Sequence, residues 1–386
     1  MKVLVSPCAY KGSFNAPQLA DAIARGVMQV LPSAACHKLA IADGGDGTLI
    51  SIHQAIGGQL LTLPVAGPTG KTVSAQWLRL RQETASTSLS ESEIDAVVEL
   101  ASASGIAYLE NQSLDPLNAN TCGTGELLAH CLKIGLKKLI LTVGGSASTD
   151  GGSGILTALG ARLLDRHDKE LAPCGKNLLE IARIDLSPLG FEPGFQYEIK
   201  IATDVDNPLL GPQGAARIFA PQKGAGKDDV ERLESGLAHF ADLLESATGV
   251  KARDLPGSGA AGGVPFGLTC ALNASIVPGY SFLSRLVGLE DELAKADLVI
   301  TAEGQLDSQS LSGKAVGGLA AACQSRSIPL IVIPARASFD FELSQLKNYG
   351  ISLVEASALA NAPASLEDVE RAAMRVCRKA LREGLI

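Results

Sequence analysis

The sequence predicts an α/β protein in which both chain ends build one parallel, doubly wound sheet around an inserted α+β segment. Three observations support this fold class. Short β-branched runs alternate with helical stretches near both ends, and polar residues follow those runs. Runs in the middle alternate apolar and polar residues, as antiparallel strands do. A chain of 386 residues is too long for one ordinary core, which favours about two domains.

The N-terminal part predicts strand, helix, strand and helix in that order. Residues 2–6 form an apolar, β-branched run. Asn15 can cap the helix that follows, and Pro17 fits its first turn. A second strand is predicted at 37–43, and a second helix at 47–56.

The C-terminal part repeats this alternation. We predict strands at 297–304, 329–335 and 351–357, and helices at 313–326, 339–350 and 365–383. The strands are continuous apolar runs, which is typical of strands buried on both faces of a parallel sheet.

The middle of the chain predicts a separate domain. Residues 71–80 and 94–100 alternate as antiparallel strands, with a polar loop at 82–93, and further strands are predicted at 137–145 and 197–205. Prolines near residues 64–68 and 278 indicate the crossing points. The predicted domains are therefore 1–65 with 286–386, and the inserted 66–285.

Composition argues against several classes of partner. Net charge is −8 and aromatic residues make up 4%, so no basic or stacking surface suggests nucleic acid or an anionic membrane. Eight scattered cysteines without a CxxC pair indicate reduced, mostly buried thiols. No signal peptide and no apolar run of membrane length is readable, so we expect a cytoplasmic protein that binds small molecules. The low aromatic content and the apolar helices are compatible with a homodimer.

Two nucleotide-binding patterns are rejected. Residues 65–72 end like a phosphate loop, but Val65 stands where glycine is required and a strand follows. Residues 257–263 satisfy GxGxxG, but no strand precedes them. We expect the second stretch to let the backbone approach a ligand.

The stretch VGGSASTDGGSG, residues 143–154, lies between a β-branched run and a predicted helix at 155–164. Strand, glycine-rich turn and helix together make an anion cradle, although no lysine follows the glycines. We expect the glycines to supply N–H donors and close approach of the backbone. Asp150 is expected to cap the helix rather than to do chemistry.

Four turns that follow predicted strands carry charged side chains. They bear Lys11 with Ser13, Asp43 with Gly44 and Gly45, Asp204 with Asp206, and Glu303 with Asp307. Two more lysines, Lys223 and Lys314, lie in Gly/Ser-rich turns. Carboxylates bind Mg²⁺, lysines bind phosphates, and a carboxylate can accept a hydroxyl proton, so these residue types together indicate phosphoryl transfer.

Nine motifs resemble, in order and spacing, the first class of bacterial glycerate kinases. They are PCAYKGS, ADGGDGT, GPTGK, GTGELL, VGGSASTDGG, ATDVDNPLLG, GAARIFAPQKGA, GSGAAGG and AEGQLDSQSLSGK. The resemblance covers nearly the whole chain. It implies a flavodoxin-like domain from both chain ends with an inserted α+β domain. It also implies phosphorylation of D-glycerate with ATP and Mg²⁺, usually at the 2-hydroxyl to give 2-phosphoglycerate, by in-line transfer in an interdomain cleft.

The chain departs from the family pattern at several positions. Cys8 replaces an aspartate, Cys122 and Gln305 replace arginines, Ala302 replaces a glycine, and Thr149 replaces an asparagine. Asp206 stands where threonine is usual. Neither cysteine nor glutamine reproduces the bidentate binding of arginine. Two alternatives therefore stay open: a catalytically weakened homologue that binds a small anion, and a kinase for another small hydroxy acid.

The resemblance and the residue types together give the predicted site. The predicted catalytic residues are Lys11, Asp43, Asp204 and Lys223, with Asp204 as the metal ligand. The predicted substrate- and phosphate-binding residues are Ser13, Gly44, Gly45, Gly144, Gly145, Ser146, Gly151, Gly152, Glu303, Asp307 and Lys314. Whether Asp204 or Asp43 holds Mg²⁺ or activates the hydroxyl is left open.

Overall fold

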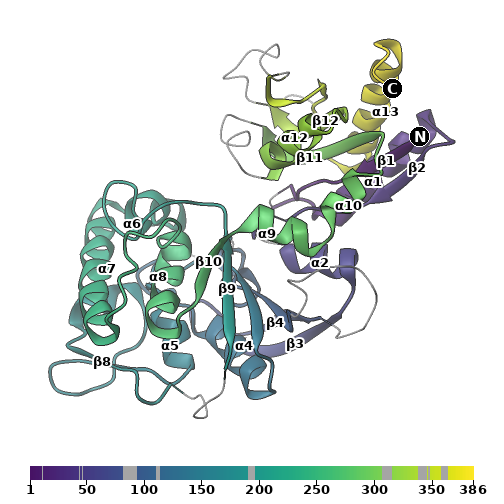
Figure 1. Ribbon diagram of the computed structural model, residues 1–386. Coiled ribbons are helices and arrows are strands. Elements are labelled where there is room, and N and C mark those ends of the chain that lie inside the picture. Colours follow the sequence, from purple (N-terminus) through teal and green to yellow (C-terminus); the bar gives the residue numbers. More distant parts are fainter. Residues whose placement is uncertain are drawn as a thin grey trace. The chain divides into compact units, whose positions relative to one another are not determined.

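The structure is a computed structural model (Figure 1). It describes residues 1–10, 12–42, 44–45, 47–80, 94–109, 114–189, 196–306, 315–337, 346, 348–357 and 364–386. The predicted loop at 82–93 and most of the predicted helix at 339–350 lie outside these residues. The chain divides into two compact units. Unit 1 comprises Met1–Asp43, Ile50–Gly57 and Tyr280–Ile386, and unit 2 comprises Gly44–Leu49 and Gly58–Gly279.

Unit 1 contains a five-stranded sheet whose neighbouring strands are all parallel, in the order β13-β12-β11-β1-β2. The strands are β1 (Lys2–Val5), β2 (Ala35–Lys38), β11 (Leu298–Leu306), β12 (Leu330–Ala337) and β13 (Leu353–Val354). The central strand β11 is buried at its apolar positions on both faces. The parallel pairing of strands from both chain ends is confirmed, and β1 and β11 are buried as predicted, whereas the edge strand β2 is largely exposed.

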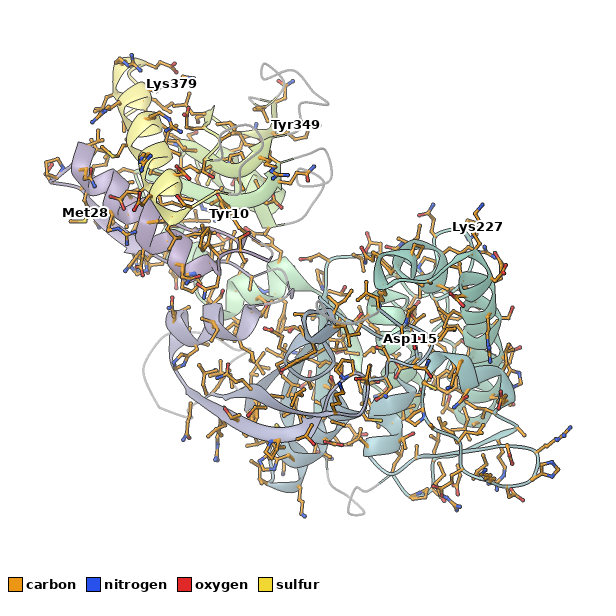
Figure 2. All side chains as sticks on the ribbon, turned by 180° about the vertical axis from the view of Figure 1, so that it is seen from behind. Tyr10, Met28, Asp115, Lys227, Tyr349 and Lys379 are labelled. Atoms are coloured by element: carbon orange, nitrogen blue, oxygen red, sulfur yellow. The ribbon has the colours of Figure 1, made fainter. Side chains whose placement is uncertain are left out.

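Helices cover both faces of this sheet. The helices α1 (Ala16–Val30) and α13 (Leu366–Arg382) share one apolar core with the sheet, and Figure 2 shows them side by side. The helices α10 (Leu289–Leu293) and α12 (Ala315–Ser325) pack on the other face. Two further helices are α2 (Thr48–Ile56) and α9 (Gly279–Leu286).

The predicted start of α1 is confirmed. Asn15 Oδ1 accepts the N–H of Gln18 at 2.9 Å, and the Gln18 side chain accepts the N–H of Asn15 at 3.0 Å. This reciprocal pair satisfies two helix N–H groups that have no partner inside the helix. Pro17 lies in the first turn, where a missing N–H costs nothing.

The second strand is shorter than predicted. β2 ends at Lys38 rather than near residue 43. Leu39 N still donates to Val5 O, but Pro7 has no N–H with which to continue the ladder. The hydroxyl of Ser6 bonds to Leu39 O at 2.7 Å instead. A proline just beyond the end of β1 therefore ends the regular pairing.

Unit 2 contains a six-stranded mixed sheet in the order β10-β9-β6-β5-β4-β3. The strands are β3 (Gln59–Ala66), β4 (Thr72–Arg79), β5 (Ala96–Glu99), β6 (Lys138–Thr142), β9 (Glu198–Thr203) and β10 (Ser275–Pro278). The predicted antiparallel pairing of β4 with β5 is confirmed, whereas β5, β6, β9 and β10 run parallel. β3 pairs with β4, although the predicted boundary at residue 65 puts it with the chain-end sheet.

One face of this sheet carries the main core of unit 2. It packs against α4 (Cys122–Lys133), α5 (Ser153–Ala158), α7 (Lys227–Thr248) and α8 (Ala260–Leu272). Figure 1 shows α6 (Ala215–Phe219), α7 and α8 gathered on one side of β9 and β10. The remaining elements are α3 (Ala101–Ser104), the short strands β7 (Arg162–Leu164) and β8 (Arg183–Asp185), and the 3₁₀ turns Ile106–Leu109, Gly175–Glu180 and Pro221–Lys223.

The helix predicted at 155–164 is also shorter than expected. α5 ends at Ala158, and β7 begins at Arg162. Gly160 between them has a φ of 113°, a left-handed conformation that glycine adopts without a steric penalty. The apolar residues 162–164 continue the pattern of the helix but belong to a strand.

Two further observations concern the class of protein. All eight cysteines are free thiols, and five of them are buried, which confirms the predicted pattern of reduced, mostly buried cysteines. Within the described ranges, no helix combines the length and apolar character needed to span a bilayer.

The close contact of α1 with α13 gives a first testable prediction. A β-carbon at Gly26 would lie 2.3 Å from Glu370 O and 2.8 Å from Ala373 Cβ. Gly26→Ala should therefore lower the free energy of unfolding by about 1–3 kcal/mol, although alanine normally favours a helix. Urea unfolding followed by circular dichroism measures this. Met28→Ala, at an exposed position of the same helix, is the control and should change stability by less than about 0.5 kcal/mol.

Candidate functional site

The carboxyl ends of the parallel strands in unit 2 meet at one edge of the sheet. Glu99 ends β5, residues 143–145 follow β6, and Asp204 follows β9. The register pairs Glu99 with Thr142, and Thr142 with Ala202. In open α/β sheets, ligands bind beyond the carboxyl ends of the strands, so this edge is the candidate site of unit 2.

Two predicted glycine turns come together at this edge. Gly144 N donates to Gly44 O at 3.0 Å. A β-carbon at Gly144 would lie 2.5 Å from Gly45 Cα, and one at Gly44 would lie 2.8 Å from Ala202 O. Only glycine permits this approach, so the turn Gly44–Gly45 lies directly against the ends of β6 and β9. Asp43 itself lies outside the described residues.

Glu99 is a residue of this edge that the sequence reasoning missed. Its side chain is 5% exposed. Oε1 accepts the N–H of Gly47 at 3.2 Å, and Oε2 accepts that of Leu49 at 3.0 Å. The carboxylate thus supports the start of α2. Its position at the end of an apolar strand was the available signal.

Most of the glycine-rich loop 143–154 is buried, and Gly145 is its exposed tip. Many of its N–H groups already have protein acceptors. The bonds run from Gly144 to Gly44 O, from Ala147 to Ser104 O, from Gly151 to Gly262 O, and from Gly152 and Gly154 to the Asp150 carboxylate. The expectation that the glycines offer their N–H groups to a ligand is therefore wrong for Gly144, Gly151 and Gly152.

The second half of the glycine-rich loop packs closely against the backbone at Gly262 and Gly267. A β-carbon at Gly262 would lie 2.4 Å from Ser148 O, and one at Gly267 would lie 2.2 Å from Gly151 O. A β-carbon at Gly151 would meet the Phe240 ring at 2.9 Å. These glycines let two parts of the protein backbone approach each other, whereas the stretch 257–263 was expected to let the backbone approach a ligand. Gly151 and Gly152 thus serve internal packing.

Lys223 lies beneath the same loop. Its side chain is 3% exposed, and Nζ donates to Ser146 Oγ at 2.8 Å and to Ser148 O at 2.6 Å. Burial disfavours the charged ammonium and lowers the pKa of Lys223 to about 7, although the charge of Asp150 opposes this shift. The lysine that seemed absent from the loop sequence is supplied by a distant segment.

Asp150 is fully buried and caps α5 as predicted. Its Oδ1 accepts the N–H of Gly152 at 3.2 Å, and its Oδ2 accepts that of Gly154 at 3.2 Å. Oδ2 also accepts the N–H and the hydroxyl of Thr121, at 2.9 and 2.8 Å. Burial raises the pKa of Asp150, and these four hydrogen bonds oppose that shift.

Unit 1 has a corresponding edge at the carboxyl ends of β1 and β11. Cys8 N donates to Ala302 O at 2.8 Å, so the segment that follows β1 continues alongside β11. Ser13 lies exposed in the turn after β1, and Glu303 lies half-buried near the end of β11. Lys11, Asp307 and Lys314 lie outside the described residues.

Tyr10 anchors the turn of unit 1 that bears Ser13. Its ring is 2% exposed and its hydroxyl donates to Ile333 O at 2.8 Å. Tyr10 N and Phe14 N bond to the backbone carbonyls of Phe14 and Tyr10 respectively. The turn is thereby fixed to the middle of β12.

The carboxylates at this edge fit a magnesium ion that is coordinated partly by the protein and partly by substrate phosphates. In the described part of the chain, no group of three or more His, Cys, Asp or Glu side chains could form an all-protein metal cage. Mg²⁺ in phosphoryl-transfer enzymes usually takes only one or two carboxylates together with substrate phosphates. Asp204 lies half-buried at the sheet edge, and its carboxylate is of the type that would hold such an ion.

Comparison with known proteins identifies the family. A family model described as the glycerate kinase family matches residues 3–383. The chain belongs to the glycerate kinase family. It is similar to a glycerate kinase of Bacillus subtilis (strain 168), with 40% identity over 88% of this chain and 86% of that protein. A glycerate 2-kinase of Escherichia coli (strain K12) is 36% identical over 92% of this chain and 90% of its own length.

A solved structure agrees with this membership. The crystal structure of a protein from Salmonella typhimurium LT2, assigned as glycerate kinase 2, aligns over 100% of both chains with a TM-score of 0.80 and 34% identity. The α/β fold of this chain, with its parallel strands and helices, is therefore the fold of a glycerate kinase structure.

Cys122 is one of the positions at which the sequence is expected to depart from the family pattern, with cysteine in place of arginine. It opens α4, and its N–H bonds to Asn120 Oδ1 at 3.0 Å. Burial, followed by the charges of Asp150 and Glu126, raises the pKa of the Cys122 thiol to about 12. The side chain is therefore neutral at physiological pH and supplies no charge at the start of α4.

The buried lysine predicts a pH-dependent stability. Between about pH 7 and the ordinary lysine value of 10.5, the unfolded chain binds the Lys223 proton and the folded chain releases it. The free energy of unfolding must therefore rise with pH in this window. From about pH 7 to pH 9, the wild-type protein should gain about 2 kcal/mol relative to Lys223→Met, measured by urea unfolding.

The control for this measurement is Lys227→Met. Figure 2 shows Lys227 at the surface, at the start of α7. Its removal should leave the slope of stability against pH parallel to that of the wild type. Parallel slopes for Lys223→Met as well would contradict the depressed pKa of Lys223.

Proposed function

We propose that this protein transfers the γ-phosphoryl group of ATP to D-glycerate, at the 2-hydroxyl, to give 2-phosphoglycerate. The observation that carries the proposal is membership of the glycerate kinase family across residues 3–383. The curated relative named glycerate 2-kinase supports the choice of hydroxyl. The residues at the carboxyl edge of the unit 2 sheet are of the types that phosphoryl transfer needs.

The proposed reaction needs one proton acceptor and several positive groups. The glycerate hydroxyl oxygen bonds to the γ-phosphorus while the bond to the bridging oxygen of ADP breaks, and the hydroxyl proton passes to a carboxylate. Asp204 or Asp43 takes that proton or holds Mg²⁺, and Lys11 binds phosphate or the glycerate carboxylate. Mg²⁺, when bound, neutralises charge on the transferring phosphates. Most of the catalysis then comes from positioning and charge stabilisation.

Lys223 contributes to the proposed site indirectly, by binding the glycine-rich loop. Its bonds to Ser146 and to the Ser148 carbonyl keep a cation directly beneath the loop while it is protonated. The exposed tip at Gly144–Gly145 is then the part of the loop that meets substrate. This assigns Ser146 and the tip to phosphate or carboxylate binding, with Gly44 and Gly45 beside them.

The strand order supports a flavodoxin-like assignment for unit 1. Counted along the chain within unit 1, the sheet order is 2-1-3-4-5, which is the order of flavodoxin-like folds. We propose that unit 1 is that domain, formed by both chain ends, and that unit 2 is the inserted domain. The first and third strands of such a sheet flank its switch point, which would assign Ser13, Glu303, Lys11, Asp307 and Lys314 to ligand binding. The free thiols support a cytoplasmic location.

Turnover of a substrate panel tests the function. The purified protein is mixed with Mg-ATP and a set of hydroxy acids, ADP release is followed, and phosphorus NMR identifies the product. We expect D-glycerate to be turned over and 2-phosphoglycerate to form. Robust turnover of a different acid in place of D-glycerate would establish the alternative kinase. Binding of glycerate without turnover of any acid would establish the weakened homologue to which Cys8, Cys122 and Gln305 point.

A pair of neighbouring carboxylates tests the site. Asp204→Asn should lower kcat/KM for glycerate at least about tenfold, because it removes the negative charge proposed to bind Mg²⁺ or accept the proton. Asp206→Asn changes the exposed carboxylate of the same turn and should change kcat/KM less than about twofold. Equal effects of the two variants in steady-state kinetics would show that the site is misplaced.

A further inference from the structure

Asp150 joins two segments that are separate in the sequence. Through Thr121 its carboxylate bonds to the residue that precedes α4, and through Gly152 and Gly154 it bonds to the start of α5. A β-carbon at Gly154 would lie 2.6 Å from the nitrogens of both Thr121 and Cys122. The start of α4 and the end of the glycine-rich loop therefore contact each other through Asp150.

Only a carboxylate satisfies this arrangement. Oδ2 accepts three donors and Oδ1 accepts one, and all of them lie in the protein interior. An asparagine offers one acceptor oxygen and would turn an N–H₂ group toward N–H donors. A buried donor without an acceptor is costly, so the neighbouring backbone would have to shift.

The glycine-rich loop is thus held from two sides. Lys223 binds it at Ser146 and at the Ser148 carbonyl, and Asp150 binds the neighbouring segments two residues further on. The negative charge of Asp150 favours the protonated form of Lys223, although burial opposes it. The five residues from Ser146 to Asp150 have little freedom between these two attachments.

We propose that Asp150 is a positioning residue for phosphoryl transfer. By tying the starts of α4 and α5 together, it fixes the loop so that its tip at Gly144–Gly145 and the Ser146 hydroxyl keep the geometry that the transition state requires. The proposal rests on the proposed function, because it assigns that loop to the site. Asp150 acts through Thr121, Gly152 and Gly154, and contacts no substrate itself.

Thr121 provides a second, milder way to change the same attachment. Its hydroxyl donates to Asp150 Oδ2 at 2.8 Å and accepts the N–H of Ile155 at 3.1 Å. Thr121→Val removes both bonds while keeping the shape of the side chain. Thr121→Ser keeps the hydroxyl and should restore the function that valine loses.

The test compares steady-state kinetics of the full-length Asp150→Asn, Thr121→Val and Thr121→Ser variants with Mg-ATP and D-glycerate. We expect kcat to fall at least about tenfold for the first two, with each KM changing less than about threefold. Thr121→Ser should stay within about twofold of the wild type. The double variant Asp150→Asn/Thr121→Val should lose less than the product of the two single losses, because both remove one shared bond.

Glu245→Gln is the matched control for lost stability. Glu245 is 2% exposed and accepts hydrogen bonds from Ala252 N, Arg253 N, Arg253 Nε and Lys251 Nζ. The Glu245→Gln variant should have a lower urea midpoint of unfolding, as the Asp150→Asn variant should, while its kcat stays within about twofold of the wild type. Unchanged kcat in both Asp150→Asn and Thr121→Val, or a kcat loss in Glu245→Gln equal to theirs, would overturn the positioning role. Failure of the proposed function would instead appear as absent turnover in the wild type.

Discussion

The segment 148–151 lies against the backbone of Gly262–Gly267 at a distance that excludes any side chain, since a β-carbon at Gly262 would come 2.4 Å from Ser148 O. The hydrogen bond from Gly151 N to Gly262 O crosses the same contact. No water fits between two backbones this close. The two charged side chains beneath the loop, Lys223 and Asp150, find partners within the protein, because an unpaired buried charge is costly. The buried hydroxyls of Ser148, Thr149 and Ser153 have no hydrogen-bond partner among the described residues.

Two buried charged side chains, Asp150 in the loop and Lys223 beneath it, are paired inside the protein. Lys223 finds Ser146 and the Ser148 carbonyl, and Asp150 finds four donors. Loss of hydration lowers the pKa of the lysine and raises that of the aspartate. The exposed part of the loop is Gly145, and it lies beside the turn Gly44–Gly45 at the carboxyl edge of the sheet, where we propose that the ligand binds. The packing below the loop thus decides which groups the site presents.

Local patterns predicted the local features well. The capping box at Asn15 was readable because its two partners are three residues apart. The strand after α1 and the helix after the glycine-rich loop were both predicted too long. Pro7, just beyond the end of β1, ended the first, and the left-handed backbone at Gly160 ended the second. A run of apolar residues gives the type of an element more reliably than its ends, because the ends depend on neighbours elsewhere in the chain.

The sequence by itself determined the family, the alternation of strands and helices, and the position of Asp204 directly after a strand. Glu303, predicted in a turn after a strand, lies within β11. The tertiary structure alone decided that Lys223 reaches Ser146 across 77 residues, that Asp150 reaches Thr121 across 29, and that Glu99 supports Leu49 across 50. It also decided that most glycines of the loop serve packing. The physical reason is that a donor chooses its acceptor by distance in space, and residue type and spacing along the chain do not specify which distant segments meet.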